Sequence, residues 1–395
     1  MVIFKSIPTQ VKNLGLVSFF NDIASEMLYP VMPIFLTQVL GAPVFIVGII
    51  EGVAEGSSSL FKTLFGYWSD RVGKRKIFVV FGYLSSAVSK VIIAFSAIWP
   101  MVFLGRFVDR FGKGLRTGAR DALLLEAAGE NNKGLIFGFH RSMDSAGAVL
   151  GPLIGFFLLS SFEGNIRLIL YAAAIPSFFA LLFLILIKDA KRNSEKNNLG
   201  LSLSLKNLPS QFKLFLLVIA VFSLGNSSDA FLILRAESLG MSLSLVILSY
   251  VLYNSVYTFV STPAGSVADK IGTKKVFLTG ILIYIFVYLG FAVTNNAFYV
   301  WPLFAIYGFY IALTDGISKA LVGSYIKKEQ AGTAYGVLQT TVSIFTLLAS
   351  VIGGFLWQAI GPQATFLFGA GCAMSALGLF LVYGKLGLKE NLVEN

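Results

Sequence analysis

The chain has 395 residues, of which 56% are hydrophobic and only 13% are charged, and its formal net charge is +11. Soluble domains have about 45–50% apolar and about 25% charged residues, so this composition rules out a disordered chain, a collagen and an ordinary water-soluble enzyme. The single cysteine, Cys372, and the single histidine, His140, rule out an intrachain disulfide framework and a metal site built from cysteine or histidine clusters.

Long uncharged runs recur from one end of the chain to the other. Each run is close to the ~20 residues that cross a ~30 Å hydrocarbon core as a helix, and the runs are too long and too uniformly apolar for the strands of a membrane barrel. The sequence therefore predicts an all-α integral membrane protein with twelve transmembrane helices in two pseudo-symmetric six-helix bundles. The predicted helices cover residues 11–36, 43–68, 77–95, 101–123, 134–159, 168–187, 214–234, 243–267, 276–293, 301–324, 332–357 and 364–383.

Lysine and arginine are distributed unevenly over the segments between the predicted helices. With both termini in the cytoplasm, the inner segments carry 20 of these residues and the outer segments carry two, Arg167 and Arg235. Because positive residues concentrate on the cytoplasmic side, we predict a multi-pass protein of the cell membrane with both termini cytoplasmic. The net positive charge then serves orientation and contact with anionic lipid headgroups, and nucleic acid is not an expected partner. No cleavable signal peptide is evident, because the first run carries Asp22 and Glu26 and should stay as a helix.

An internal repeat divides the chain. A polar linker at residues 188–213 separates six predicted helices in residues 1–187 from six in residues 214–395. The segment GYWSDRVGKRK after the second helix recurs as GSVADKIGTKK after the eighth, with matching positions 199 residues apart. Parallel six-helix repeats are the architecture of one class of transporters, whose substrate site lies between the halves near the midplane. The motif positions are Gly66, Asp70, Arg71 and Gly73 in the first copy and Gly265, Asp269, Lys270 and Gly272 in the second.

The loop pattern G-x-x-x-D-[RK]-x-G-x-[RK]-[RK], present twice, resembles the loop signature of the major facilitator superfamily, and the resemblance covers essentially the whole chain. The segments RFVDRFGKGLRTGARDAL and VSFFNDIASEMLYPVMPIF are similar to a prokaryotic branch whose members mostly lack an assigned substrate. In the fifth helix, GAVLGPLIG, with Gly147, Gly151 and Pro152, resembles the G-x-x-x-G-P motif of the antiporter branches. Such glycines also serve plain helix packing. The resemblance implies a gate on the inner side that loop contacts latch when the transporter faces outward.

The residue types of the loop motif suit a gate. Asp70 follows the second helix and can accept hydrogen bonds from the amino end of a neighbouring helix, whose dipole favours an anion. Gly66 allows close helix approach and Gly73 permits a tight turn. We expect Arg71 to pair with Asp121 at the inner end of the fourth helix. The three bases that follow, KRK, are expected only to set topology.

The fourth predicted helix carries a charged stripe. At 100° per residue, seven charged residues fall on one arc of about 140°. A charge at the bilayer centre costs roughly 2.5–3.5 kcal/mol on insertion scales, so we predict that the stripe faces the bundle interior or a water-filled cavity. Its central part, residues 106–113, is the predicted functional site, and its inner end belongs with the gate. The stripe consists of Arg106, Asp109, Arg110, Lys113, Arg116, Arg120 and Asp121.

Compensating acids lie in the same half. Ionised carboxylates that are buried close together repel one another, which is how one of them becomes a proton carrier near neutral pH. We expect at least one to titrate, with Glu51, Glu55 and Asp22 first because no base is adjacent in the sequence; permanent salt bridges are the alternative. Asp109 is expected to be locked by the bases around it on the same helix. The six acids are Asp22, Glu26, Glu51, Glu55, Asp109 and Asp144.

The carboxyl half offers fewer polar candidates. On the eighth helix Tyr250, Asn254 and Tyr257 follow a helical spacing, so they can line the cavity from this half, although packing explains the pattern equally well. On the tenth helix Asp315 and Lys319 are four residues apart, which predicts a structural ion pair.

The motifs of nucleotide hydrolysis, serine hydrolases and zinc peptidases are missing from the sequence, so neither an enzyme nor a cofactor is expected. We predict a secondary active transporter, a proton-coupled exporter of a small organic solute that acts by alternating access as a monomer in the lipid bilayer. Import or exchange of an anionic metabolite is the first alternative, because arginine and lysine on the fourth helix can bind a carboxylate or phosphate. A non-transporting membrane sensor or a lipid-handling protein is a further alternative that rests on fold analogy.

Overall fold

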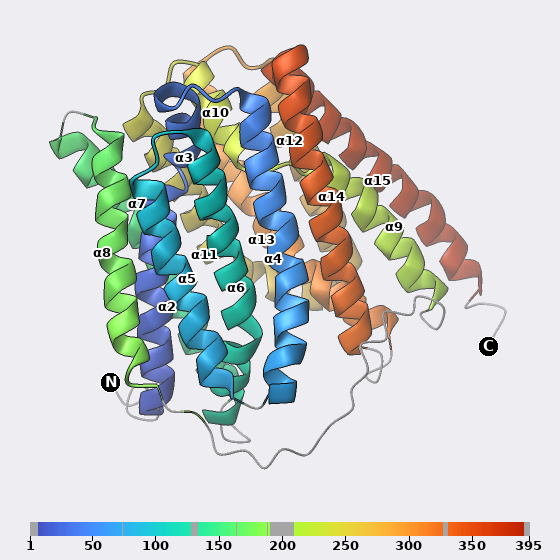
Figure 1. Ribbon diagram of the computed structural model, residues 1–395. Helices are drawn as coiled ribbons and strands as arrows, with labels where there is room; N and C mark the ends of the chain where they lie inside the picture. Colours follow the sequence, from blue (N-terminus) through green and yellow to red (C-terminus); the bar gives the residue numbers. More distant parts are fainter. Residues whose placement is uncertain are drawn as a thin grey trace. The chain divides into compact units, whose positions relative to one another are not determined.

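The computed structural model of the protein describes residues 7–72, 74–127, 133–162, 164–187, 189, 209–326 and 331–390. Within these ranges all regular secondary structure is helical (Figure 1), which confirms the predicted all-α class. The helices of the first half are α2 (Thr9–Leu28), α3 (Met32–Ile34), the π-helix η1 (Phe35–Val39), α4 (Val44–Val72), α5 (Arg75–Ala94), α6 (Trp99–Ala127), α7 (Lys133–Ser161) and α8 (Ile166–Leu184). Those of the second half are α9 (Ser210–Gly225), α10 (Ala230–Ser238), α11 (Leu243–Ile271), α12 (Thr273–Val293), the 3-10 helix η3 (Ala297–Tyr299), α13 (Val300–Tyr325), α14 (Ala331–Ala359) and α15 (Pro362–Glu390).

Twelve segments of the described chain correspond to the twelve predicted crossings. Ten are both long and apolar enough to cross a membrane, with α9 and α10 together forming one of them. The other two are α2, continued by α3 and η1, and α6. Their hydropathy is lowered by the acids of α2 and by the charged stripe of α6.

The internal repeat is a repeat of structure as well as of sequence. Helices α4 and α11 are each 29 residues long and begin 199 residues apart, and α7 and α14 are each 29 residues long and begin 198 residues apart. The first crossing of each half is also broken at a matching place: α2 ends at Leu28 before Pro30, and α9 ends at Gly225 before the turn-forming sequence NSSD. Proline lacks the amide donor that a helix interior needs, and Asn, Ser and Asp favour turns, so both breaks follow from the sequence.

The chain divides into two compact units. Unit 1 consists of Met1–Ala42, Val53–Asn198 and Ser242–Val251, and unit 2 consists of Pro43–Gly52, Leu199–Met241 and Leu252–Asn395. The first turns of α4 therefore group with unit 2 and the first turns of α11 with unit 1. The domain boundaries at residues 187 and 214 stay a prediction, and most of the linker lies outside the described residues.

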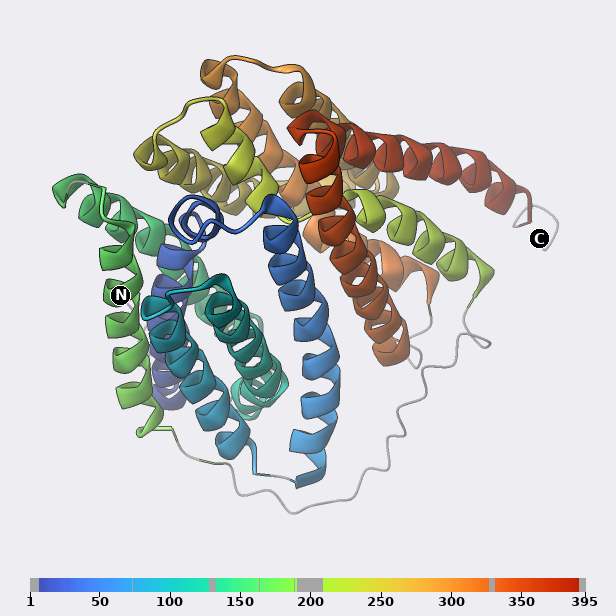
Figure 2. The same ribbon diagram turned by 45° about the horizontal axis from the view of Figure 1, so that its top comes forward.

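Unit 1 has an apolar core at one end of its helix bundle. Helices α5 and α6 lie side by side, as both views show (Figures 1 and 2), and α2 packs along α7 and α8. The core brings together α2, α5, α6, α7 and α8 through Leu14, Tyr83, Leu123, Ile136, Leu184 and their buried apolar neighbours. The charged stripe continues from this core along α6 toward the other end of the helix.

Unit 2 has an aromatic core. Tyr284 and Tyr288 of α12 stack with ring centroids 4.0 Å apart, and Tyr310 of α13 meets Tyr284 edge-on at 4.9 Å. Tyr284 donates a hydrogen bond of 2.8 Å to the carbonyl of Gly225, at the end of α9. The hydroxyl of Tyr284 thereby binds a main-chain carbonyl at the helix break.

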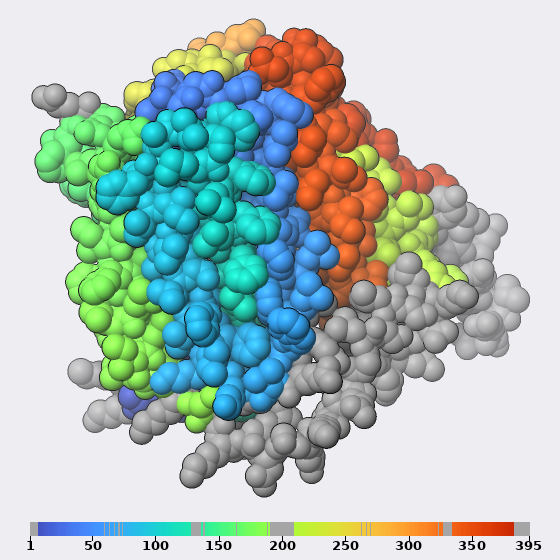
Figure 3. Space-filling view, in the orientation of Figure 1, coloured from blue at the N-terminus to red at the C-terminus, as the bar shows by residue number. Residues whose placement is uncertain are grey.

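Large apolar side chains cover the outside of the helices. Phe81 of α5 is 56% exposed and Phe178 of α8 is 61% exposed. Both helices lie on the face shown in the space-filling view, where their side chains form a continuous surface (Figure 3). An exposed apolar surface of this extent is typical of a protein that faces hydrocarbon.

Two arginines bind the carboxyl ends of helices. Arg235 of α10 is 4% exposed, and its Nε and Nη2 donate hydrogen bonds of 3.0 and 2.7 Å to the carbonyls of Phe291 and Thr294, at the end of α12. In unit 1, Arg167 donates a hydrogen bond of 3.0 Å to the carbonyl of Ser96, just beyond α5. Both guanidinium groups therefore sit where the helix dipole attracts a positive charge.

Candidate functional site

The charged stripe of α6 faces the interior of unit 1, as the sequence predicts. Arg106, Asp109, Arg110 and Arg116 are 5–8% exposed. Lys113 is half-buried on the same face. The close approach of α5 keeps the stripe covered: Gly112 of α6 packs so tightly that an added Cβ would lie 2.4 Å from the carbonyl oxygen of Gly82. Glycine is required here because any side chain would push the two helices apart.

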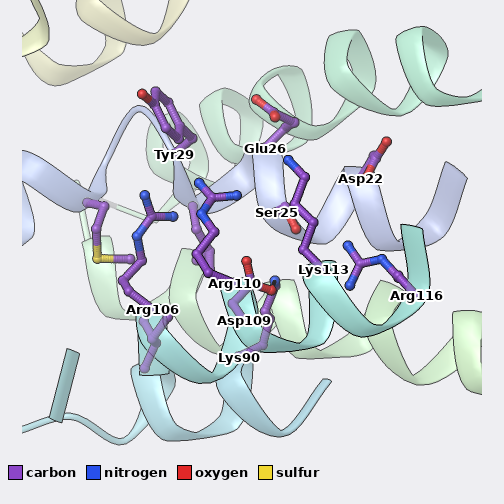
Figure 4. A pocket seen from close by; sticks show the side chains of 13 residues that line it. Asp22, Ser25, Glu26, Tyr29, Lys90, Arg106, Asp109, Arg110, Lys113 and Arg116 are labelled. Atoms are coloured by element: carbon purple, nitrogen blue, oxygen red, sulfur yellow. Dashed lines mark hydrogen bonds and ion pairs between the residues drawn. The ribbon is translucent and has the colours of Figure 1, made fainter. Parts of the chain in front are cut away.

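A polar pocket, partly open to solvent, lies along the stripe. Side chains from α2, α5 and α6 point toward one another around it (Figure 4). The two acids of α2 and the four charged residues of α6 from Arg106 to Lys113 are predicted members of this site. Arg116, which is predicted to belong with the gate, also lines the pocket, and Lys90 of α5 is not among the predicted site residues. The charged lining residues are Asp22, Glu26, Lys90, Arg106, Asp109, Arg110, Lys113 and Arg116, and the others are Ser25, Leu28, Tyr29, Met32 and Ile93.

Two ion pairs hold four of the charges near the pocket. Nζ of Lys90 lies 2.6 Å from Oδ1 of Asp109, and the two side chains are 2% and 7% exposed. Nη2 of Arg110 lies 2.9 Å from Oε1 of Glu55 on α4. Asp109 is thus locked as expected, but its ion-pair partner comes from the neighbouring helix. Glu55, a candidate for titration, is committed to an arginine.

Aromatic rings line the α2 side of the pocket. The guanidinium of Arg106 lies 5.8 Å from the centroid of the Tyr29 ring, which in turn stacks on Tyr250 at 5.4 Å. Tyr250, on the part of α11 that belongs to unit 1, donates a hydrogen bond of 2.9 Å to Oε2 of Glu26. Tyr250 is therefore placed beside the predicted site. The other two predicted site residues, Asn254 and Glu51, belong to unit 2.

Lys113 and Asp22 are held less firmly than the paired residues. Among the described residues the amine of Lys113 makes neither a hydrogen bond nor an ion pair, and Figure 4 shows it extending between Glu26 and Asp22. Asp22 accepts a hydrogen bond of 3.2 Å from the amide of Asn21. The pocket thus combines fixed pairs with a lysine and two carboxylates that are free to change partners.

The glycine motif of α7 sets the position of these carboxylates. An added Cβ at Gly147 would lie 2.7 Å from the carbonyl oxygen of Phe19 and 3.0 Å from Cβ of Asp22. An added Cβ at Gly151 would lie 2.6 Å from the carbonyl oxygen of Ile23 and 3.0 Å from Cβ of Glu26. The motif therefore lets the backbone of α2 lie directly against α7. Pro152 follows inside α7 without ending the helix.

Toward the core of unit 1 a second polar network begins. Nδ1 of His140 lies 3.5 Å from Oδ2 of Asp144 on α7. Arg120 donates to Oδ1 of Asp121 at 3.0 Å and to the hydroxyl of Ser18 at 3.1 Å. The partner that the structure gives Asp121 is therefore Arg120, and Asp144 belongs with His140 rather than with the pocket lining.

The described part of the loop motif agrees with the predicted turn. Gly272, in the second copy, has φ of 100° and precedes α12, a conformation that favours glycine. The close approach expected at Gly66 does not require glycine there, because a Cβ added at Gly66 would meet nothing within 4 Å. The tight position is Gly118 of α6, where an added Cβ would lie 3.1 Å from Cα of Gly66. Gly265 has no neighbour of this kind, and the Lys270 side chain is exposed. Gly73 and the side chains of Asp70, Arg71 and Asp269 lie outside the described residues.

Unit 2 contains a polar cluster that the sequence does not single out as a site. Asp229, between α9 and α10, accepts hydrogen bonds of 2.6 Å from the hydroxyl of Tyr307 and 3.0 Å from that of Tyr253. The only hint of this cluster in the sequence is Asp229 itself, an acidic residue at a helix break within an otherwise apolar crossing.

The predicted pair of Asp315 and Lys319 is present at 3.6 Å. In the described ranges no group of three or more His, Cys, Asp or Glu residues is arranged to hold a metal.

Comparison with known proteins agrees with this geometry. The sequence model of the Major Facilitator Superfamily matches residues 14–234 and 214–392. The chain is similar to an uncharacterised MFS-type transporter of Methanocaldococcus jannaschii, with 38% identity over 94% of this chain and 93% of the relative. It is 23% identical to the class E tetracycline resistance protein of Escherichia coli, over 92% of each chain. Its fold is similar to that of the nucleoside transporter NupG, with a TM-score of 0.80, 15% identity and coverage of 95% of this chain and 99% of that one. With its twelve crossings and repeated halves, the chain belongs to the major facilitator superfamily of transporters.

Proposed function

We propose that this chain is a proton-coupled secondary active transporter that moves a small organic solute by alternating access. It acts as a monomer in the cell membrane, with both termini in the cytoplasm. The observation that carries the proposal is the pocket of unit 1, in which carboxylates, lysine and arginine meet inside a membrane-spanning bundle. Ionisable groups in such a position mark substrate and ion pathways.

Proton coupling is assigned to Asp22 and Glu26. The other two acids near the pocket, Asp109 and Glu55, are held in ion pairs of 2.6 and 2.9 Å, so protonating either would cost a strong interaction. Asp22 and Glu26 make hydrogen bonds with neutral groups, which permit either protonation state. Of the acids near the pocket, Asp22 and Glu26 are therefore the two that can gain or lose a proton most easily.

Two directions of transport have separate support. Export is favoured by the likeness to a tetracycline resistance protein and by the Gly–Pro motif of α7. Import or exchange of an anionic metabolite is favoured by the bases that line the pocket, since arginine and lysine recognise carboxylate and phosphate groups.

Everted membrane vesicles with an acidified lumen and a pH-sensitive dye test the proposal. An exporter releases luminal protons when its solute is added outside, whereas an importer releases them when its solute is preloaded inside. The matched control is the Asp22→Asn/Glu26→Gln variant, which should carry no protons in either arrangement. If neither a solute panel nor an imposed solute gradient moves protons, the proposed coupling is wrong.

A further inference from the structure

A second hollow of unit 1 lies on the outside of the bundle, between α5 and α8. Its volume is about 440 Å³, which falls within the roughly 300–1,000 Å³ of pockets that hold small organic ligands. The two helices pack against each other, and both contribute to the face shown in Figure 3. The lining residues are Lys76, Val80 and Leu84 of α5 and Leu181, Leu184 and Ile185 of α8.

The hollow is a groove with an apolar length and one basic end. Lys76, Val80 and Leu84 are spaced four residues apart, so they follow one another along one side of α5. Lys76 lies in the first turn of α5, and the three apolar residues of α8 lie at the end of that helix. The basic end of the groove is therefore where α5 begins and α8 ends, at the lower end of both helices in Figure 1.

The floor of the groove is part of the apolar core of unit 1. Leu184 belongs to this core and is 3% exposed, and Val80 and Leu181 pack against it. Leu84 and Ile185 are exposed and form the rim. The groove is thus shaped by packed side chains and opens outward, on the side where a membrane-spanning bundle meets hydrocarbon.

The amine of Lys76 is available at the basic end. In the described ranges it makes neither a hydrogen bond nor an ion pair. The carboxylate of Asp189 accepts a hydrogen bond of 3.3 Å from the backbone amide of Lys76 and so satisfies a donor at the start of α5. Arg75 is paired with Glu126, and Lys74 is exposed. Among these five charged groups one positive charge is left over.

We propose that this groove binds an anionic glycerophospholipid, with an acyl chain along the apolar lining and the headgroup phosphate on Lys76. The occupant needs an apolar part for the groove and an anionic group for the lysine, and a phospholipid carries the two in this order from the bilayer centre to its surface. With the predicted orientation, the basic end lies in the cytoplasmic leaflet, where anionic lipids create a negative surface potential.

The proposal gives Lys76 a second role. It is the third base of the KRK segment, for which the sequence predicts only an effect on topology. A lipid held in this way bridges the start of α5 and the end of α8. The proposal goes beyond the transport function and depends neither on the transported solute nor on proton coupling.

Native mass spectrometry of the full-length protein tests the proposal. The protein in neutral detergent is mixed with equal amounts of dioleoyl phosphatidylglycerol and dioleoyl phosphatidylcholine, which share their acyl chains and differ in net charge. The measured quantity is the ratio of the two lipids in the complex that retains a single lipid. We expect phosphatidylglycerol to exceed phosphatidylcholine by about fivefold, the effect of one basic residue close to anionic lipid.

Three lysine variants test the basic end. Lys76→Gln should lower the ratio about fivefold, whereas Lys76→Arg should keep it, because arginine also binds phosphate. The matched control is Lys275→Gln, at the equivalent position of the second repeat, where the side chain is exposed. It removes the same charge from the protein and should leave the ratio unchanged.

A pair of bulky substitutions tests the apolar length of the groove. Leu84→Trp should reduce the retention of both lipids, because the larger ring occupies the space of the acyl chain. Phe81→Trp enlarges an exposed side chain of the same helix outside the lining, so lipid retention should stay at the wild-type level. The unfolding temperature of each variant shows whether it is folded.

A wild-type ratio of one, or a ratio that Lys76→Gln leaves unchanged, would overturn the proposal. An equal decrease in Lys275→Gln would do the same, because binding would then follow total charge rather than the groove. Glycerol phosphate, which has no acyl chain, should not displace phosphatidylglycerol, and displacement would show that the basic end takes a soluble anion instead. None of these outcomes affects the vesicle assay, so the proposed transport function is tested separately.

Discussion

Lys90 and Asp109 form the most buried ion pair of the pocket wall. Their side chains are 2% and 7% exposed, and Asp109 also accepts a hydrogen bond of 3.4 Å from Ser89. Two charges inside a membrane protein are tolerated because each is the other's counter-charge. The pair joins α5 to α6 directly beneath the pocket.

Removing one partner should therefore be costly. We expect Lys90→Met to destabilise the protein by about 3–5 kcal/mol, because it leaves the Asp109 carboxylate buried without compensation. The unfolding temperature in detergent, followed by tryptophan fluorescence, measures the loss. The double variant Lys90→Met/Asp109→Leu is the control and should recover most of the stability. A single variant as stable as wild type would contradict the assignment.

The sequence predicts which face of α6 is buried, but not which residues of the neighbouring helices contact the charges on that face. Periodicity fixes directions around one helix axis, and four of the seven charges of the stripe, Arg106, Asp109, Arg110 and Arg116, are buried as predicted. The partners depend on how neighbouring helices are placed along that face. Lys90 and Glu55 reach the stripe from α5 and α4, and Tyr250 reaches Glu26 from α11. These tertiary pairings leave no local signal in the sequence.

Helix α7 offers a graded test of close packing against α2. Gly147→Ala and Gly151→Ala each bring a methyl group to within 2.7 Å of a carbonyl oxygen of α2. We expect each to cost about 1–3 kcal/mol and to displace Asp22 or Glu26. The readouts are unfolding temperature and proton release in the vesicle assay.

The next glycine in the same row supplies the control. An added Cβ at Gly155 would have its nearest neighbour at 3.6 Å, the carbonyl oxygen of Met27, which is ordinary contact. Gly155→Ala should therefore leave stability and transport close to wild type. Equal effects at Gly151 and Gly155 would show that helix flexibility, rather than close approach, is what these glycines provide.

Across the whole chain, the repeat was the most informative feature of the sequence. An offset of 199 residues found in the loop motif reappears in the bounds of α4 and α11. The twelve crossings were predictable because a hydrocarbon core demands long apolar helices. The division into units was less predictable, because the first turns of α4 group with unit 2 and the first turns of α11 group with unit 1. That exchange depends on packing between helices, which hydropathy does not encode.

The repeat also generates a prediction for the gate. Asp70→Asn should slow transport several-fold while leaving solute affinity nearly unchanged, because the predicted gate acts on the transition between states and not on the pocket. Transport rate and binding affinity must be measured on the same preparation. Asp269→Asn, at the equivalent position of the second copy, is the matched comparison. A large loss of affinity in Asp70→Asn would contradict the gating role.

The arginines that bind the ends of α5 and α12 bear on how the chain is inserted. Arg167 and Arg235 are the two positive residues of the predicted outer segments, and both are engaged by main-chain carbonyls. In the folded protein their charge is absorbed by helix ends and does not act as a free topogenic signal. These hydrogen bonds form only after the chain has been inserted, so they contribute to the stability of the fold. Replacing either arginine should therefore weaken folding more than it changes topology.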